Sequence, residues 1–158
     1  MSYELIEFYH NSNDKIRNQI IDLWVNNQAL TVIEALNRVN YVVCAIRHIP
    51  SDKIIGVSTA KIIILPKTND IYYFYGMFID KEHRGADENL CTVKPGISKT
   101  TFNVLKRQNN KYIKGVAATI ENERITDKML QRYGWTKLED NSLKFRLFFK
   151  NFEDNNYY

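Results

Sequence analysis

The sequence predicts an α/β (α+β) protein with one domain, built on a central mixed, mostly antiparallel sheet of about seven strands flanked by about four helices. The chain has 158 residues, which is the length of one domain with a core of its own. Aromatic residues make up 13% of it, with ten Tyr and eight Phe, which is typical of strands. Apolar residues recur with strand and helix periods in alternating segments, which indicates a mixed fold.

The N-terminal half of the chain predicts three strands and two helices. Capping side chains at 11–14 precede Ile20, Leu23 and Trp24 at helical spacing. The turn sequence from Pro50 to Lys53 lies between two apolar runs and predicts a hairpin. The expected elements are a strand over 3–9, a helix that follows the capping residues and runs to about 26, a short helix over 31–37 and strands over 41–48 and 54–65.

The C-terminal half predicts four strands and two helices. The strand over 71–79 is apolar on both faces, which indicates a central position in the sheet. A helix over 97–107 has Ile97 and Thr101 on its inward face, and Gly134 stands where a helix ends. The other expected elements are a strand over 112–120, a helix over 122–133 with Ile125, Met129 and Leu130 inward, strands over 136–138 and 143–150, and a loose tail. The domain is expected over 1–150 and the tail over 151–158.

The positive charge is concentrated in one segment of the chain. The net charge is +4, and residues 81–115 alone carry eight Lys or Arg against three Asp or Glu. The residues before this segment sum to −1 and those after it to zero. Such a cluster suits an anionic ligand. A nucleic-acid partner is the weaker interpretation, because the basic residues surround one loop and helix instead of forming a stripe.

Several classes of protein are not supported by the sequence. The two cysteines, Cys44 and Cys91, form no Cys-x-x-Cys pair, and the three histidines lack metal-ligand spacing, so no metal is expected. No apolar run approaches the roughly 20 residues of a membrane helix, and the N-terminus does not resemble a signal peptide. We therefore expect a cytoplasmic protein without a membrane partner. Frequent Asn, Ile, Lys and Tyr suggest a low-GC bacterium or its phage, and hence the host cytoplasm or the virion.

The segment from Ile71 to Lys106 carries the signal for function. The central strand runs into Asp80-Lys81-Glu82-His83-Arg84-Gly85, and after Ala86–Pro95 the residues Gly96-Ile97-Ser98-Lys99 are expected to open a helix. The first turn of a helix has unpaired N–H groups and the positive end of the helix dipole. A strand, a glycine loop and a helix start in this order predict a phosphate site.

These residues resemble motifs of the GNAT superfamily of N-acetyltransferases, which bind acetyl-coenzyme A. Met77-Phe78-Ile79 and Arg84-Gly85 are similar to the family's fourth strand and the start of its pyrophosphate loop. Gly96-Ile97-Ser98 resembles the Gly-x-Gly or Gly-x-Ala that closes this loop. Asn122 and Gly134-Trp135 resemble its fourth helix, which contains an asparagine and ends at a glycine followed by an aromatic residue.

The resemblance implies transfer of an acetyl group from acetyl-coenzyme A, as co-substrate, to the amine of a small-molecule or protein acceptor. It implies that the pantetheine arm lies along the strand at 77–79 and faces Asn122, and that early helices and late loops, here 12–40 and 140–143, read the acceptor. Backbone N–H groups would hold the pyrophosphate. The implied cofactor-binding residues are Met77, Phe78, Ile79, Arg84, Gly85, Gly96, Ile97, Ser98, Lys99 and Asn122.

Three departures from the family pattern leave a second interpretation open. The segment Ala86–Pro95 interrupts the loop, Ser98 replaces a small glycine or alanine, and Leu130 stands where many members have a tyrosine as general acid. Tyr133 lies nearby and is the candidate catalytic residue. For the base, the groups near the loop are Asp80, Glu82 and His83. The alternative is a noncatalytic GNAT-fold structural or interaction protein with assembly partners, such as a phage virion component.

Overall fold

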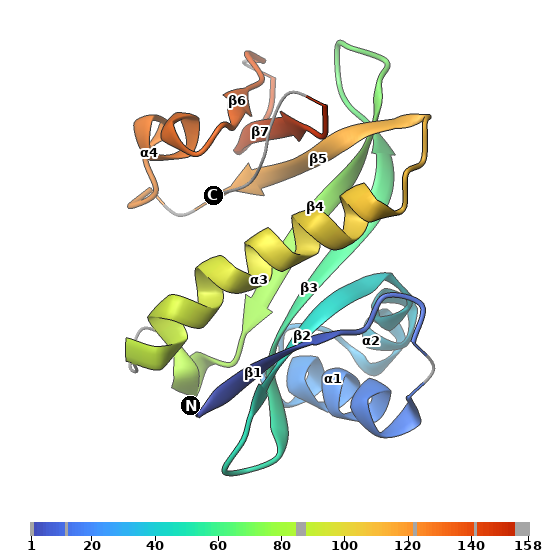
Figure 1. Ribbon diagram of the computed structural model, residues 1–158, viewed down its shortest axis with the longest axis vertical. Coiled ribbons are helices and arrows are strands. Elements are labelled where there is room, and N and C mark those ends of the chain that lie inside the picture. Colours follow the sequence, from blue (N-terminus) through green and yellow to red (C-terminus); the bar gives the residue numbers. More distant parts are fainter. Residues whose placement is uncertain (1, 12, 85–87, 122, 141, 154–158) are drawn as a thin grey trace. The chain divides into compact units, whose positions relative to one another are not determined.

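The described residues form four α-helices, two 3-10 helices and seven strands (Figure 1). The structure is a computed structural model that describes residues 2–11, 13–84, 88–121, 123–140 and 142–153, and only the backbone over 88–95. In chain order the elements are β1 (Tyr3–Glu7), α1 (Asp14–Asn26), α2 (Val32–Arg38), η1 (Val39–Tyr41), β2 (Val42–His48), β3 (Lys53–Ile64), β4 (Ile71–Ile79), η2 (Lys81–His83), α3 (Glu88–Arg107), β5 (Ile113–Ile120), α4 (Asp127–Arg132), β6 (Thr136–Lys137) and β7 (Arg146–Asn151).

The seven strands form one mixed sheet in the order β1-β2-β3-β4-β5-β7-β6. The pairs β1/β2, β2/β3, β5/β7 and β6/β7 are antiparallel, and β4/β5 is parallel. The parallel register begins at Ile71–Ile113 and reaches Phe74–Ala117, and β4 continues to Ile79. The predicted fold class and the central position of β4 are confirmed.

The chain divides into two compact units, and strands β3 and β4 and helix α3 contribute to both. Unit 1 comprises Met1–Ala60 and Gly76–Val104. Unit 2 comprises Lys61–Tyr75 and Leu105–Tyr158. Each unit has a hydrophobic core of its own: one cluster includes Trp24 and Val57, and the other is built around Leu65, Tyr72, Ala117 and Leu147.

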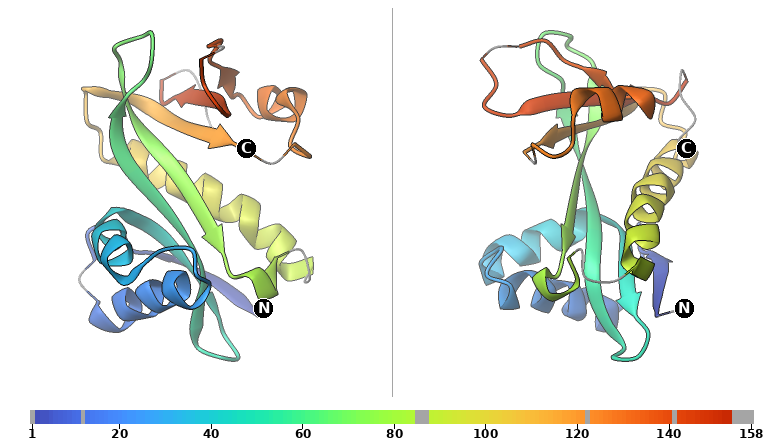
Figure 2. Two further views of the ribbon diagram at one scale, coloured as in Figure 1. Left: turned by 180° about the vertical axis from the view of Figure 1, so that it is seen from behind. Right: turned by 90° about the vertical axis from the view of Figure 1, so that its left-hand side faces the viewer.

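In unit 1, helices cover both faces of the strands. Figure 2 shows α1 and α2 on one face and α3 on the other. Asn13 begins α1, because its side chain accepts the N–H of Ile16 at 3.1 Å. The inward residues Ile20, Leu23 and Trp24 are buried, which confirms the predicted face of this helix.

A chain of hydrogen bonds joins α3 to the strands of unit 1. The Cys44 N–H donates to Ser58 Oγ at 3.1 Å, and the Thr101 hydroxyl donates to the Ile97 carbonyl at 2.6 Å. The two hydroxyl oxygens of Ser58 and Thr101 are 2.7 Å apart, so the Ser58 hydroxyl donates to Thr101. Both side chains are fully buried, and among the described residues no buried side-chain nitrogen or oxygen lacks a hydrogen-bond partner.

In unit 2, β5 and β7 approach each other closely. A Cβ atom at Gly115 would collide with the backbone carbonyl oxygen of Lys150, so only glycine fits there. The strand pairing reaches Asn151, opposite Gly115, and the Phe152 N–H donates to the Lys114 carbonyl at 2.9 Å. The first two residues of the predicted loose tail are therefore held against β5.

The predicted start of the long helix was wrong. Helix α3 begins at Glu88, not at Ile97, and Pro95 and Gly96 lie inside it. The resemblance predicts a loop that closes at Gly96, and a proline within a helix costs about 3 kcal/mol, so the local sequence opposes the observed helix. The burial of Ile97 and Thr101 on the strands of unit 1 stabilises the helix against this local preference.

The predicted helix over 122–133 was also too long. Helix α4 covers Asp127–Arg132, because the Thr126 side chain accepts the Met129 N–H at 3.2 Å and caps the helix there. Met129 was expected to face inward but is 45% exposed. The predicted helix end is confirmed, since Gly134 follows with φ 88°. The other predicted elements are confirmed to within a few residues at their ends.

Candidate functional site

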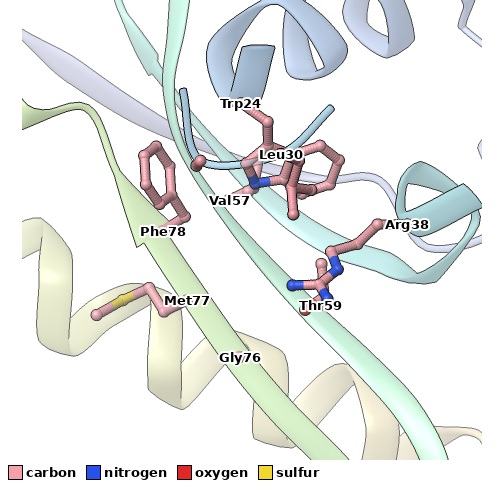
Figure 3. Close-up of a pocket in the computed structure, with 9 residues that line it drawn as sticks. Trp24, Leu30, Arg38, Val57, Thr59, Gly76, Met77 and Phe78 are labelled. Atoms are coloured by element: carbon pink, nitrogen blue, oxygen red, sulfur yellow. The ribbon is translucent and has the colours of Figure 1, made fainter. Parts of the chain in front are cut away.

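Unit 1 contains a pocket of about 230 Å³ that lies against the predicted cofactor strand (Figure 3). It is formed by residues from α1, the loop after it, α2, β3 and β4. Its lining residues are Trp24, Ala29, Leu30, Arg38, Val57, Thr59, Gly76, Met77 and Phe78. Small-molecule sites are typically concave and mostly apolar with a few polar groups, and this pocket has that composition.

The apolar walls of the pocket belong to the core of unit 1. Trp24 and Val57 are buried in the cluster between α1, α2 and the strands, and Leu30 and Phe78 pack against it. Side chains in a packed core are held in one arrangement. The pocket therefore has preformed walls.

Two polar side chains line the pocket, Arg38 at the end of α2 and Thr59 on β3. Figure 3 shows the Arg38 side chain extending from α2 toward Thr59. A Cβ atom at Gly76 would lie 3.0 Å from Thr59 Oγ1. A larger residue at position 76 would therefore press on this hydroxyl, and glycine leaves the space in front of it open.

Four of the predicted cofactor-binding residues lie together at the end of β4. Met77 and Phe78 line the pocket, and Ile79 follows them, buried. The Arg84 Nε–H donates to the Ile79 carbonyl at 2.7 Å, and the guanidinium carbon lies 5.0 Å from the centre of the Phe78 ring. Arg84 is thereby fixed beside the strand, and its remaining N–H groups can meet an anion.

The predicted phosphate donors at Gly96–Lys99 are placed differently from the sequence prediction. They lie two turns inside α3, where each backbone N–H is used by the helix itself. Ile97 is fully buried, and a Cβ atom at Gly96 would lie 3.3 Å from Leu5 Cδ1. Ser98 is half-buried and Lys99 is exposed. The free N–H groups of this helix belong to its first turn, Glu88–Cys91.

The remaining predicted site residues lie either outside the described residues or in unit 2. Gly85 and Asn122 lie outside the described residues. Tyr133, the candidate general acid, belongs to unit 2, where it follows α4 with 52% of its surface exposed. Its backbone carbonyl accepts a hydrogen bond from Lys150 Nζ at 2.5 Å, and its catalytic role stays a prediction.

Two of the candidate bases near the loop have structural partners. The Asp80 carboxylate accepts the Glu82 N–H at 3.0 Å and caps η2. His83 Nδ1 and the Tyr3 hydroxyl form a hydrogen bond of 2.9 Å. In the structure, Asp80 and His83 therefore stabilise the conformation of the segment that follows β4.

The sequence analysis missed Arg38, although a local signal was present. Thr31 and Glu34 form a capping box at the start of α2, and a basic residue four positions after Glu34 ends the helix. This pattern places Arg38 on a short helix. It does not reveal the pocket, because Trp24, Val57 and Gly76 come from distant parts of the sequence.

Unit 2 has a larger and more polar pocket, of about 590 Å³. It is lined by Lys106, Asn109, Asn110, Lys111, Ile113, Lys114, Asn151, Phe152 and Glu153. All three lysines are exposed, and Lys114 forms an ion pair with Asp70 at 3.1 Å. Much of the positive charge that the sequence concentrates at 81–115 therefore lies on this surface.

The described residues contain no cluster of three or more His, Cys, Asp or Glu side chains that could hold a metal ion. Cys44 is fully buried in unit 1. No helix in the described part of the chain has the length and apolar character needed to span a membrane.

Comparison with known proteins identifies similar structures but no similar sequences. No protein-family model and no curated protein matches the sequence. The ribosomal-protein-S5-alanine acetyltransferase of Vibrio fischeri is 16% identical, with a TM-score of 0.60 over 98% of this chain and 95% of that one.

Two further solved structures match over nearly their whole lengths. Salmonella typhimurium yncA, solved with its cofactor acetyl-CoA, is 9% identical, with a TM-score of 0.63 over 98% of this chain and 96% of that one. Glucosamine-6-phosphate N-acetyltransferase of Arabidopsis thaliana is 12% identical, with a TM-score of 0.59 over 91% of this chain and 98% of that one. At these identities the comparison establishes the fold. The chain therefore has the fold of the GNAT superfamily of acetyltransferases.

Proposed function

We propose that the protein is an N-acetyltransferase that moves an acetyl group from acetyl-coenzyme A to the amine of an acceptor. The observation that carries this proposal is the preformed pocket of unit 1, which lies against Met77 and Phe78 of β4 in a GNAT fold. One of the similar structures was solved with acetyl-CoA. The pocket is partly lined by residues of the early helices, where the family resemblance predicts the acceptor.

The chain offers groups that fit coenzyme A beside this pocket. The backbone of Met77–Ile79 is extended and can hydrogen-bond the pantetheine arm as an added strand. Arg84 contacts the Ile79 carbonyl and the Phe78 ring, and its other guanidinium N–H groups can bind a phosphate. The first turn of α3, Glu88–Cys91, presents backbone N–H groups that have no partner within the helix, in the role that the resemblance gives to Gly96–Lys99.

The reaction is a direct transfer between two bound substrates. The amine nitrogen forms a bond to the acetyl carbon, the thioester C–S bond breaks, and the thiolate leaves. None of the nine described lining residues carries a carboxylate or an imidazole, so the amine proton passes to water. A thiolate leaves readily, since a free thiol has a pKa of about 8.5, so a general acid is not required.

The binding of acetyl-coenzyme A tests this proposal directly. We expect isothermal titration calorimetry to show one site, and Arg84→Ala to weaken binding by about tenfold, since a hydrogen bond to a charged group contributes about 1.5–3 kcal/mol. Lys81→Ala is the matched control, because Lys81 is an exposed cation three residues earlier. Equal losses in the two variants would mean that Arg84 acts only through general charge, and would remove it from the site.

The second candidate function is a noncatalytic module on the same fold. It is favoured by the position of Gly96–Lys99 inside α3, which removes the glycine-led helix start expected for the phosphate loop. A calorimetric titration without heat at millimolar acetyl-coenzyme A would support this candidate and overturn the proposed activity.

A further inference from the structure

The pocket of unit 1 has one charged lining residue among the nine that the structure describes, and this residue is Arg38. The others are apolar or neutral, and none is acidic. A cationic acceptor such as a polyamine or a lysine-rich peptide would meet a like charge here with no carboxylate to balance it. The charge of the pocket therefore favours a ligand that carries a negative group.

The structure of α2 leaves the Arg38 guanidinium available. The nearest acidic residue on this helix is Glu34, whose Oε1 accepts the Thr31 N–H at 3.0 Å in the capping box. Hydrogen bonds from Thr31 and then the positive charge of Arg38 lower the pKa of the Glu34 carboxyl, which thus stays ionised at the start of the helix. Within the described part of the chain, the Arg38 side chain forms no hydrogen bond or ion pair.

The geometry of Arg38 suits a carboxylate. A guanidinium presents parallel N–H donors that bind the two oxygens of one carboxylate, and a single arginine balances its single charge. A phosphate, with a charge near −2, would call for a second cation that the lining residues do not supply. Thr59 lies beside the guanidinium and adds a hydroxyl (Figure 3).

The size and walls of the pocket restrict the rest of the ligand. Its volume of about 230 Å³ is below the range of roughly 300–1,000 Å³ for drug-sized ligands. Trp24, Leu30, Val57 and Phe78 form its apolar walls. A small molecule with an apolar side chain fits this space.

We propose that the pocket binds a small amino-carboxylate with an apolar side chain, an amino acid or a close analogue, and that Arg38 selects it by binding its carboxylate. That this molecule is the acetyl acceptor rests on the proposed function; that it binds does not. Arg38 thus determines which amine enters, and β4 lies against the same pocket for the transfer.

Three probes with the same apolar side chain and an amine test the role of the carboxylate without acetyl-coenzyme A. L-leucine carries an amine, an apolar side chain and a carboxylate, L-leucinamide replaces the carboxylate by a neutral amide, and 3-methylbutylamine lacks it. Ligand-detected NMR titrations on the full chain should show leucine binding about tenfold more tightly than either analogue, the advantage of a charge-assisted pair. Equal affinities for the three probes, or no binding of leucine, would overturn the proposal.

Substitutions test whether Arg38 is the cause. Arg38→Ala should reduce leucine affinity to that of leucinamide, and Arg38→Lys should retain part of the preference, since it keeps the charge without the planar fork. Arg17→Ala is the matched control, because Arg17 lies on α1, pairs with Asn40 Oδ1 at 3.0 Å and is not one of the lining residues. A preference for leucine that survives in Arg38→Ala would contradict the assignment.

The two proposals fail in different ways. Leucine binding that depends on Arg38, together with no binding of acetyl-coenzyme A, would retain the amino-carboxylate pocket and remove the acetyltransferase. If acetyl-coenzyme A binds and leucinamide is acetylated as fast as leucine, the acetyltransferase would be retained and the selection of a carboxylate by Arg38 would be removed.

Discussion

The two units of the protein use positive charge in opposite ways. In unit 1, one arginine borders a small pocket whose walls belong to the core. In unit 2, three exposed lysines surround a wider polar pocket, and a further lysine, Lys150, is completely buried. Arg38 is exposed, as the three lysines are, but it differs from them in its apolar neighbours and in its planar guanidinium, which can hold a carboxylate in one orientation. The three lysines are flexible point charges among mostly polar side chains.

This contrast explains why the charge of the sequence was a misleading guide. Residues 81–115 carry the whole positive excess, yet much of it lies around the pocket of unit 2. Arg38 comes from the first 80 residues, which are slightly acidic in total. We expect substitutions in the pocket of unit 1 to change ligand binding, and substitutions in unit 2 to change stability.

The largest effect is expected where β5 meets β7. Gly115→Ala places a Cβ atom against the Lys150 carbonyl, and the backbone cannot accommodate it without losing strand pairing. We expect a loss of more than about 4 kcal/mol, or no folded protein, in urea denaturation. Gly96→Ala in unit 1 is the control, since its Cβ would meet only the end of the Leu5 side chain at 3.3 Å. A similar loss of stability in Gly115→Ala and Gly96→Ala would contradict the view that the close approach of β5 and β7 makes only position 115 intolerant of a side chain.

The next largest effect concerns the buried lysine of unit 2. Burial lowers the pKa of Lys150 to about 8, from 10.5 in the unfolded chain. Below pH 8 the folded state therefore bears the full cost of the buried charge, and this cost disappears as the pH rises from 8 toward 10.5. Lys150→Met should be more stable than the wild type at pH 7 by about 2 kcal/mol, taking 1.36 kcal/mol per pKa unit and allowing for the lost hydrogen bond.

Urea denaturation at pH 7 and at pH 10 checks this prediction. The difference between Lys150→Met and the wild type should shrink at the higher pH, and tyrosine ionisation cancels because both proteins contain the same tyrosines. Lys128→Met, at an exposed position on α4, should show no such change. A difference that is constant with pH would mean that Lys150 is not destabilised by its burial.

A smaller effect is expected from the neutral buried network of unit 1. Thr101→Val leaves the Ser58 hydroxyl without an acceptor, which costs about 1–3 kcal/mol. Thr100→Val, on the neighbouring, half-buried position of α3, should change stability by less than about 0.5 kcal/mol. The loss in Thr101→Val should be independent of pH from 6 to 10, in contrast to Lys150. A loss of stability in Thr101→Val that changes with pH would contradict the assignment of a neutral hydrogen-bond network to unit 1.

The sequence predicted the elements whose signals are local. The capping residue and apolar spacing before Trp24 located α1, and the apolar run from Ile71 to Ile79 located β4 at the centre of the sheet. The start of α3 was missed, because Pro95 and Gly96 oppose a helix locally while the packing of Ile97 and Thr101 sustains it. Local preferences are weak compared with such packing.

The candidate site could be predicted only in part. The residues at the end of β4 and Arg84 follow one another closely in the chain, so a family motif reveals them. The pocket combines Trp24, Arg38, Val57 and Gly76, whose proximity depends on the complete packing of α1 and α2 on the strands. No pattern of spacing in a single sequence contains that information.

The central claim is acetyl transfer to an amine held in the pocket of unit 1. The most direct measurement is to incubate the wild-type protein with acetyl-coenzyme A and L-leucine and to analyse the products by mass spectrometry. The account predicts N-acetyl-leucine and free coenzyme A in equal amounts, with formation of both greatly reduced in Arg38→Ala. Acetyl-coenzyme A and leucine that both remain unchanged, with folded protein present at high concentration, would contradict it.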